Sequence, residues 1–205
     1  SELLAVGKVD QFSPTLPYAA LTSAFRTLVL HLLGLSAEEV AQWKVRLSRE
    51  LEGYEALAVS LVPELRLLLD NKPRFTSDTF SIDTRARFSH MVLALVKAFA
   101  SAGCPLVLLL DDIHWIDAAS LQILEYLLIH ASTVPLLMVV AHRDACSLPD
   151  SALHHQLANL HLASRNTTEL RPEPLSVKAV SLWLANIFHI RSASTLDLAG
   201  LIHEK

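Results

Sequence analysis

Glycine is scarce in this chain, with five glycines among 205 residues. They do not form the G-x-x-x-x-G-K-[ST] pattern of a phosphate-binding loop, in which glycine amides surround the phosphates. The single G-K pair is Gly7-Lys8. Glu2 stands where the first glycine of the pattern belongs, and Val9 stands where serine or threonine belongs. The chain is therefore expected to contain no loop that binds a nucleotide cofactor.

Cysteine, basic clusters and long apolar runs are also few or missing. Cys104 and Cys146 have neither C-x-x-C nor zinc-site spacing, which predicts two reduced thiols. The formal net charge is -4 and no block of lysine or arginine occurs, so nucleic-acid binding has no electrostatic support. No apolar run reaches the ~18 residues that a membrane span needs, and no signal-peptide pattern is visible. These features predict a cytoplasmic protein without a nucleic-acid or membrane partner.

Hydrophobic residues, in contrast, are abundant. They make up 52% of the chain, the mean hydropathy is +0.37, and charged residues reach only 19%. A chain of this length can bury a sizeable core. The low charged share suggests that other parts of a larger protein cover some of the surface. Because the chain begins at Ser1, we expect a fragment of a longer protein.

Short aliphatic runs alternate with segments of helical periodicity, and this alternation favours an α/β fold with a parallel sheet. The runs predict strands at 3–6, 106–110 and 136–141, with a weak strand at 168–171. Between the first two strands, residues 18–70 are expected to form a helical insert, which Pro63 should kink or split. Further helices are predicted at about 83–99, 117–128, 151–160, 176–184 and 195–203. The expected helix caps are Ser36 with Glu39, Asp83, Asp117 and Ser176.

The strand at 106–110 leads directly into two carboxylates, Asp111 and Asp112. In open parallel sheets, ligands bind beyond the carboxyl ends of the strands. One acid of such a pair could hold a hydrated Mg²⁺ while the other orients a water molecule. The next strand ends near Arg143, which would lie beside the acids if the two strands are neighbours. The sequence thus points to phosphate chemistry at this edge.

Plainer interpretations of the same residues remain open. One acid could cap the following turn while the other is solvated, and Arg143 could pair with Asp144. His114 lies close to the acids, but no second histidine is placed to complete a metal cluster. No G-x-S-x-G motif supports a serine hydrolase. The acids also lack the D-x-D spacing of an aspartyl-phosphate enzyme.

Four segments in order carry a family resemblance: "GKVDQFSPTLPYAALTSAFRTLV", "LVPELRLLL", "LVLLLDDIHWIDAASLQILEYLL" and "VVAHRD". Together they resemble the predicted-ATPase module of bacterial multidomain signalling proteins, which belongs to the STAND-type, AAA-like P-loop NTPases. In hybrid sensors this module stands between a serine/threonine-kinase-like domain and histidine-kinase domains. The resemblance covers nearly the whole chain.

The resemblance implies a role for each site residue. Residues 106–112 would be the Walker B strand, with Asp111 as the Mg²⁺-associated acid and Asp112 as the acid that polarises the attacking water. Arg143 would occupy the sensor position at the end of the next strand, although His142 stands where an aromatic residue is common. ATP and Mg²⁺ would be the cofactors of the intact parent, and this chain alone would hold neither.

The resemblance also implies the organisation of the chain. Residues 1–190 would form an incomplete three-layer P-loop NTPase core, and residues 191–205 would begin a C-terminal helical segment. In the family, the strand that carries the phosphate-binding loop precedes the point where this chain starts. The predicted function is part of an ATPase switch domain of a signalling protein, with a non-hydrolysing regulatory or scaffolding module as the alternative. The expected partners are flanking kinase or effector domains, with self-association as a further option.

Overall fold

A computed structural model of the chain describes residues 3–9, 17–69, 82–101, 103–143, 160 and 166–203. The chain divides into two compact units, Ser1–Arg165 and Asn166–Lys205. The boundary predicted at residue 190 falls inside the second unit. Within the described part of the chain, every helix is too short or too polar to serve as a membrane span.

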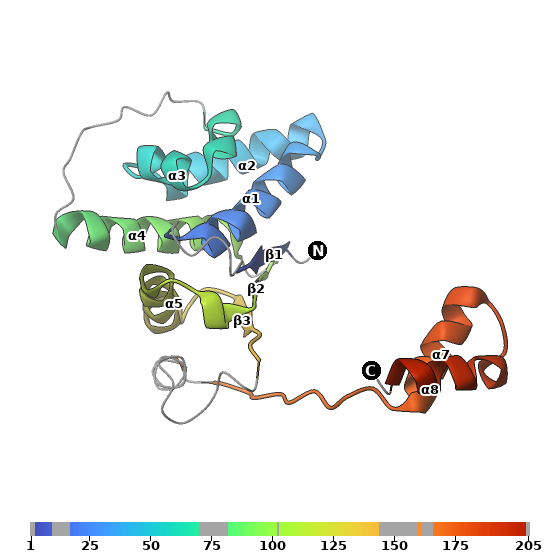
Figure 1. The fold of residues 1–205 in the computed structure, drawn as a ribbon. Helices are drawn as coiled ribbons and strands as arrows, with labels where there is room; N and C mark the ends of the chain where they lie inside the picture. The colour runs from blue at the N-terminus through green and yellow to red at the C-terminus, as the bar shows by residue number, and fades with distance from the viewer. Residues whose placement is uncertain are drawn as a thin grey trace. The chain divides into compact units, whose positions relative to one another are not determined.

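The first unit contains a parallel sheet of three strands, which its helices flank (Figure 1). Its strands are β1 (Leu3–Lys8), β2 (Leu106–Asp111) and β3 (Leu136–Val140), in the order β1-β2-β3. Leu3 pairs with Leu106, which pairs with Leu136, so the three aliphatic runs lie side by side in register. The α/β class and the three strands predicted from these runs are confirmed.

Helices fill the described residues between β1 and β2. They are α1 (Ala19–Leu33), α2 (Ala37–Glu50), α3 (Glu55–Leu61), the 3-10 helix η1 (Pro63–Leu67) and α4 (Ile82–Phe99). Pro63 separates α3 from η1, as predicted, because proline lacks the amide hydrogen that would continue the helix. Ser36 and Glu39 form the expected capping box of α2. The expectation for Asp83 was wrong, since α4 begins at Ile82 and Asp83 lies within its first turn.

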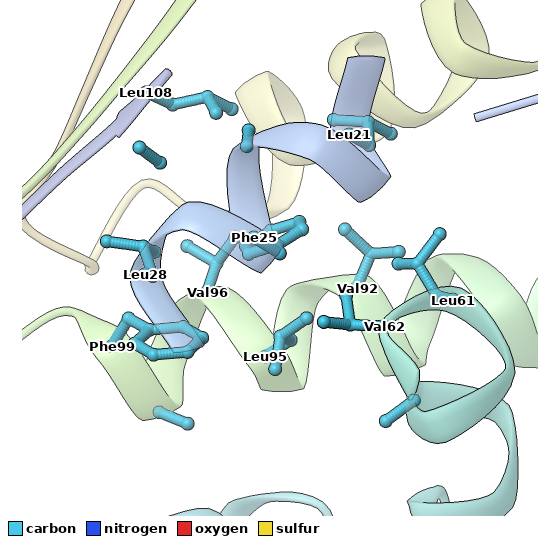
Figure 2. Close-up of a cluster of buried hydrophobic side chains, with 14 of the residues drawn as sticks. Leu21, Phe25, Leu28, Leu61, Val62, Val92, Leu95, Val96, Phe99 and Leu108 are labelled. Carbon is cyan, nitrogen blue, oxygen red and sulfur yellow. The ribbon is translucent and has the colours of Figure 1, made fainter. Parts of the chain in front are cut away.

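The helices of the first unit cover one face of the sheet. In the strand order β1-β2-β3, each strand is added on the same side of the one before it. Because the connections between parallel strands are right-handed, the helices of both connections then lie on the same face of the sheet. The second crossover carries η2 (Ile113–Trp115) and α5 (Ala118–His130). Figure 2 shows the resulting core, in which Phe25 on α1 and Phe99 on α4 lie near Leu108 on β2. These side chains are fully buried.

The opposite face of the sheet stays largely open. Leu4 and Leu137 are 53% and 58% exposed, and Val6 and Val139 are exposed as well. Of the three layers expected for the fold, the described residues of the first unit therefore form two, the sheet and one helical layer.

The second unit contains α7 (Val177–Phe188), the 3-10 helix η4 (Ser192–Thr195) and α8 (Leu196–His203). Ser176 caps α7, as predicted, by accepting a hydrogen bond from the Ala179 amide. The buried hydroxyls of Ser181 and Thr195 lie 2.9 Å apart and join α7 to η4.

Two further expectations concern residues near the unit boundary. The weak strand predicted at 168–171 is wrong, because these residues form neither strand nor helix and Leu170 is 82% exposed. The helix predicted at 151–160 lies outside the described residues, apart from Leu160, which is helical and packs in the core.

Candidate functional site at the carboxyl edge of the sheet

Asp111 is the last residue of the middle strand, and backbone hydrogen bonds hold this strand end on both sides. On one side, the Val9 amide donates to the Asp111 carbonyl at 3.1 Å. On the other, the Ala141 amide donates to Leu110 and the Ile113 amide donates to the Ala141 carbonyl, at 2.9 and 3.0 Å. The acids therefore lie where ligands bind in open parallel sheets.

Asp112 follows the last strand residue and has a left-handed backbone conformation, with φ 54° and ψ 37°. Aspartate tolerates this region better than most residues other than glycine, because its short polar side chain can bond locally. The Asp112 amide donates to Asp111 Oδ1 at 2.9 Å. One carboxylate thus fixes the backbone of the other, and the chain turns sharply into η2.

Two cationic or potentially cationic side chains flank the Asp112 carboxylate. Lys8 Nζ lies 3.8 Å from Asp112 Oδ2, and His114 Nδ1 lies 3.9 Å from Asp112 Oδ1. The Lys8 side chain is 71% exposed, that of Asp112 is 25% exposed and that of His114 only 4%. Gly7-Lys8 does not form a phosphate-binding loop, and no motif in the sequence predicts that Lys8 lies beside Asp112. The contact follows from the register of the two strands, which places Lys8 opposite Asp111.

Asp117, the third acid of the segment, has a structural role. It caps α5, as predicted, by accepting from the Ser120 amide at 2.8 Å and from the Ser120 hydroxyl at 2.5 Å. Its Oδ2 also accepts from the Tyr18 amide at 3.2 Å, which ties the start of α1 to the start of α5. Burial, followed by the Asp117 charge, raises the pKa of Tyr18.

Arg143 follows β3 at the same edge. The predicted parallel pairing of β2 with β3 is confirmed, and Arg143 lies three residues beyond the end of β3. Its side chain is exposed. The alternative pairing with Asp144 lies outside the described residues.

The residues at this edge fit a hard divalent cation bound partly through water. Mg²⁺ is usually held by one or two carboxylates and keeps several water ligands. Asp111 and Asp112 supply such oxygens, and both are only partly buried. A three-ligand cluster of histidine, cysteine and acids is absent from the described residues, so the D-D-x-H arrangement gains no support as a closed metal site.

Comparisons with known proteins agree with the geometry. Residues 2–140 match the family described as the AAA ATPase domain. A segment of 122 residues, 60% of the chain, is 32% identical to "Hybrid signal transduction histidine kinase G" of Dictyostelium discoideum. The chain spans only 4% of the length of that relative. No solved structure matches the chain significantly.

Proposed function

Because this chain belongs to the AAA ATPase domain family, we propose that it is part of an ATP-binding switch domain in a cytoplasmic signal-transduction protein. The observation that carries the proposal is the pair of carboxylates, Asp111 and Asp112, at the carboxyl end of the middle strand of a parallel sheet. Nucleotide-binding proteins of this architecture place their chemistry at that edge.

Each residue at the edge has a proposed part. Asp111 holds Mg²⁺, most simply through the metal's water ligands, since its Oδ1 already accepts from the Asp112 amide. Asp112 orients and polarises the water that attacks the terminal phosphate. Arg143, which follows β3, contacts that phosphate, so that the conformation of the domain depends on whether the phosphate is present. When bound, Mg²⁺ would neutralise phosphate charge, which is the main electrostatic demand of phosphoryl transfer.

The parent protein would supply what this sequence lacks. It would carry the phosphate-binding loop of a STAND-type module and flanking kinase or effector domains in the same polypeptide. The match to a hybrid signal transduction histidine kinase supports this context. Nucleotide binding would then bias the position of the flanking domains, and hydrolysis would reset it.

A non-hydrolysing regulatory or scaffolding module is the second candidate. It is favoured by the apolar sheet face, which could be covered by self-association. Both candidates use the same fold, and only the first needs a cation at Asp111.

A paramagnetic cation tests the distinction. Mn²⁺ prefers the same oxygen ligands as Mg²⁺ and broadens the amide resonances near its site. Titrated into the isotopically labelled chain, it should broaden the amides around Asp111 and the end of β1. Asp111→Asn should abolish that broadening, whereas the exposed control Asp197→Asn in the second unit should not. Broadening that is spread over the surface and unchanged by Asp111→Asn would favour the scaffolding module.

In the parent protein, a second measurement separates binding from chemistry. Asp112→Asn should leave ATP binding within a few fold of the unsubstituted protein and reduce hydrolysis by about 10²-fold or more, the range typical of losing a general base. Equal losses of binding and hydrolysis would contradict the role proposed for Asp112.

A further inference from the structure

His114 is a buried histidine whose ring nitrogen Nδ1 has no hydrogen-bond partner among the described residues. Its side chain is only 4% exposed. A buried polar atom without a partner costs about 1–3 kcal/mol, so an Nδ1 left in this state would be a persistent cost to the fold. The surroundings therefore need to offer Nδ1 a hydrogen-bond partner.

A carboxylate oxygen of Asp112 lies close to Nδ1. The atoms Nδ1 and Oδ1 are 3.9 Å apart, which is about 1 Å longer than a hydrogen bond between them. The other oxygen of that carboxylate, Oδ2, faces Lys8 at 3.8 Å. Oδ1 is thus directed at a buried imidazole, and Oδ2 is directed at an exposed amine.

The backbone around His114 keeps this arrangement in place. The 3-10 helix η2 is anchored by the bond from the Ile113 amide to Ala141, and the Trp115 amide donates to the Asp112 carbonyl at 3.1 Å. The Trp115 ring lies 5.1 Å from the His114 ring, centroid to centroid. Closing the remaining distance requires Oδ1 to move about 1 Å toward Nδ1.

We propose that His114 is a positioning residue, whose Nδ1–H donates a hydrogen bond to Asp112 Oδ1. The bond fixes the rotation of the Asp112 carboxylate and keeps Oδ2 directed toward the open edge of the sheet. It also fixes the histidine tautomer, because a neutral ring that donates from Nδ1 carries no hydrogen on Nε2. The hydrogen bond stands on geometry alone, whereas its use in orienting a water molecule rests on the function proposed above.

The tautomer of His114 can be observed without nucleotide or metal. At about pH 9, well above the ordinary histidine pKa of about 6.5, histidine rings are neutral and long-range proton–nitrogen spectra distinguish the two tautomers. The chain has ten histidines, and the signals of His114 are those that disappear in His114→Gln. The proposal expects the Nδ1–H tautomer to dominate at His114.

Two variants identify the acceptor. Asp112→Gly removes the carboxylate, and glycine tolerates the left-handed backbone at this position without strain. In this variant His114 should lose its Nδ1–H preference. Asp111→Asn is the matched control, because an asparagine oxygen can still accept from the Asp112 amide, and the tautomer should not change. If Asp112→Gly does not fold, Asp112→Ala provides the same test, because alanine also has no side-chain acceptor.

The outcomes separate this inference from the proposed function. Two results would each overturn the role of His114, whatever the cation does. One is a dominant Nε2–H tautomer in the unsubstituted chain, and the other is an Nδ1–H tautomer that persists in Asp112→Gly. A dominant Nδ1–H tautomer that depends on Asp112 supports it, even if Mn²⁺ binds nowhere near Asp111. In that case the hydrogen bond exists and its use in phosphate chemistry fails.

Discussion

At the scale of single residues, Gly7 shows how tightly the edge of the sheet is built. A Cβ added at Gly7 would lie 2.3 Å from the carbonyl oxygen of Ala20 and 2.9 Å from Leu110 Cδ2. The first of these atoms belongs to the backbone of α1 and cannot move away like the end of a side chain. Gly7 therefore permits the close approach of α1 to β1, which also sets the position of Lys8 beside Asp112.

Gly7→Ala should lower the free energy of unfolding of the first unit by about 1–3 kcal/mol, the usual cost of overpacking. Chemical denaturation followed by circular dichroism measures the change. Gly103→Ala is the control, since a Cβ there meets nothing within 4 Å, and its effect should stay within about 0.5 kcal/mol. Equal effects of the two substitutions would show that α1 adjusts its distance from β1 easily.

Single residues also show where sequence reasoning succeeds. Asp111 was placed correctly because five aliphatic residues in a row predict a buried strand and fix where it ends. The sequence does not predict that Lys8 lies beside Asp112, and it places His114 near the acids only as part of an incomplete metal cluster. Both side-chain contacts depend on the sharp turn at Asp112 or on pairing across β1 and β2. Neither the backbone angle nor the register is visible in a linear pattern.

At the scale of elements, Asp117 joins two helices that are far apart in sequence. It caps α5 and accepts from the Tyr18 amide at the start of α1, a residue 99 positions away. The sequence predicts the first of these bonds, because aspartate before a helical stripe is a common cap. It does not predict the second, because that bond requires β1 and β2 to be paired first.

Asp117→Ala should therefore cost more than a cap alone, which contributes about 1 kcal/mol. The loss of the bond from Tyr18 adds a partly buried amide without its acceptor, so we expect about 2 kcal/mol in total. Hydrogen exchange of the Tyr18 and Ser120 amides should accelerate together. In Asp117→Asn one oxygen remains to accept, so the destabilisation should be smaller. If the Tyr18 amide keeps its protection in Asp117→Ala, the link between α1 and α5 is not formed in solution.

The segment at 168–171 shows the opposite case, in which a local pattern fails. Its residues have adequate strand propensity, but Pro172 and Pro174 follow closely and lack the amide hydrogens that a sheet needs. A strand also requires a neighbour, and this segment has no paired strand among the described residues. Helix caps are local and can be predicted from sequence, whereas an isolated weak strand cannot.

At the scale of the whole molecule, strand order explains why one sheet face is open. Consecutive strands that advance in one direction place all their crossover helices on the same side. Leu4, Val6, Leu137 and Val139 on the other side are left exposed, although they are as apolar as the buried residues beside them. Composition alone suggests a partly covered surface, and the structure locates part of the uncovered apolar area on this face.

The last prediction concerns nucleotide affinity of the chain by itself. In proteins with a phosphate-binding loop, backbone amides and a lysine around the phosphates supply much of the affinity, and this sequence contains no such loop. The carboxylates of Asp111 and Asp112 repel a triphosphate unless a cation lies between them. One contact made through a hydrated ion should barely offset the several kcal/mol that association costs. We therefore expect a Kd for Mg-ATP of about 1 mM or weaker, which corresponds to about -4 kcal/mol at most.

Titration calorimetry of the chain with Mg-ATP measures this affinity, with Asp111→Ala as the variant and the exposed Asp197→Ala as its control. Weak heats that are the same for all three proteins are the expected result. Micromolar binding abolished by Asp111→Ala alone would mean that the chain builds a nucleotide site without a phosphate-binding loop. In that event Lys8, the exposed amine 3.8 Å from Asp112, would be the first residue to substitute. It is the cation that the register of β1 and β2 places nearest to the acids, where phosphate charge would have to be balanced.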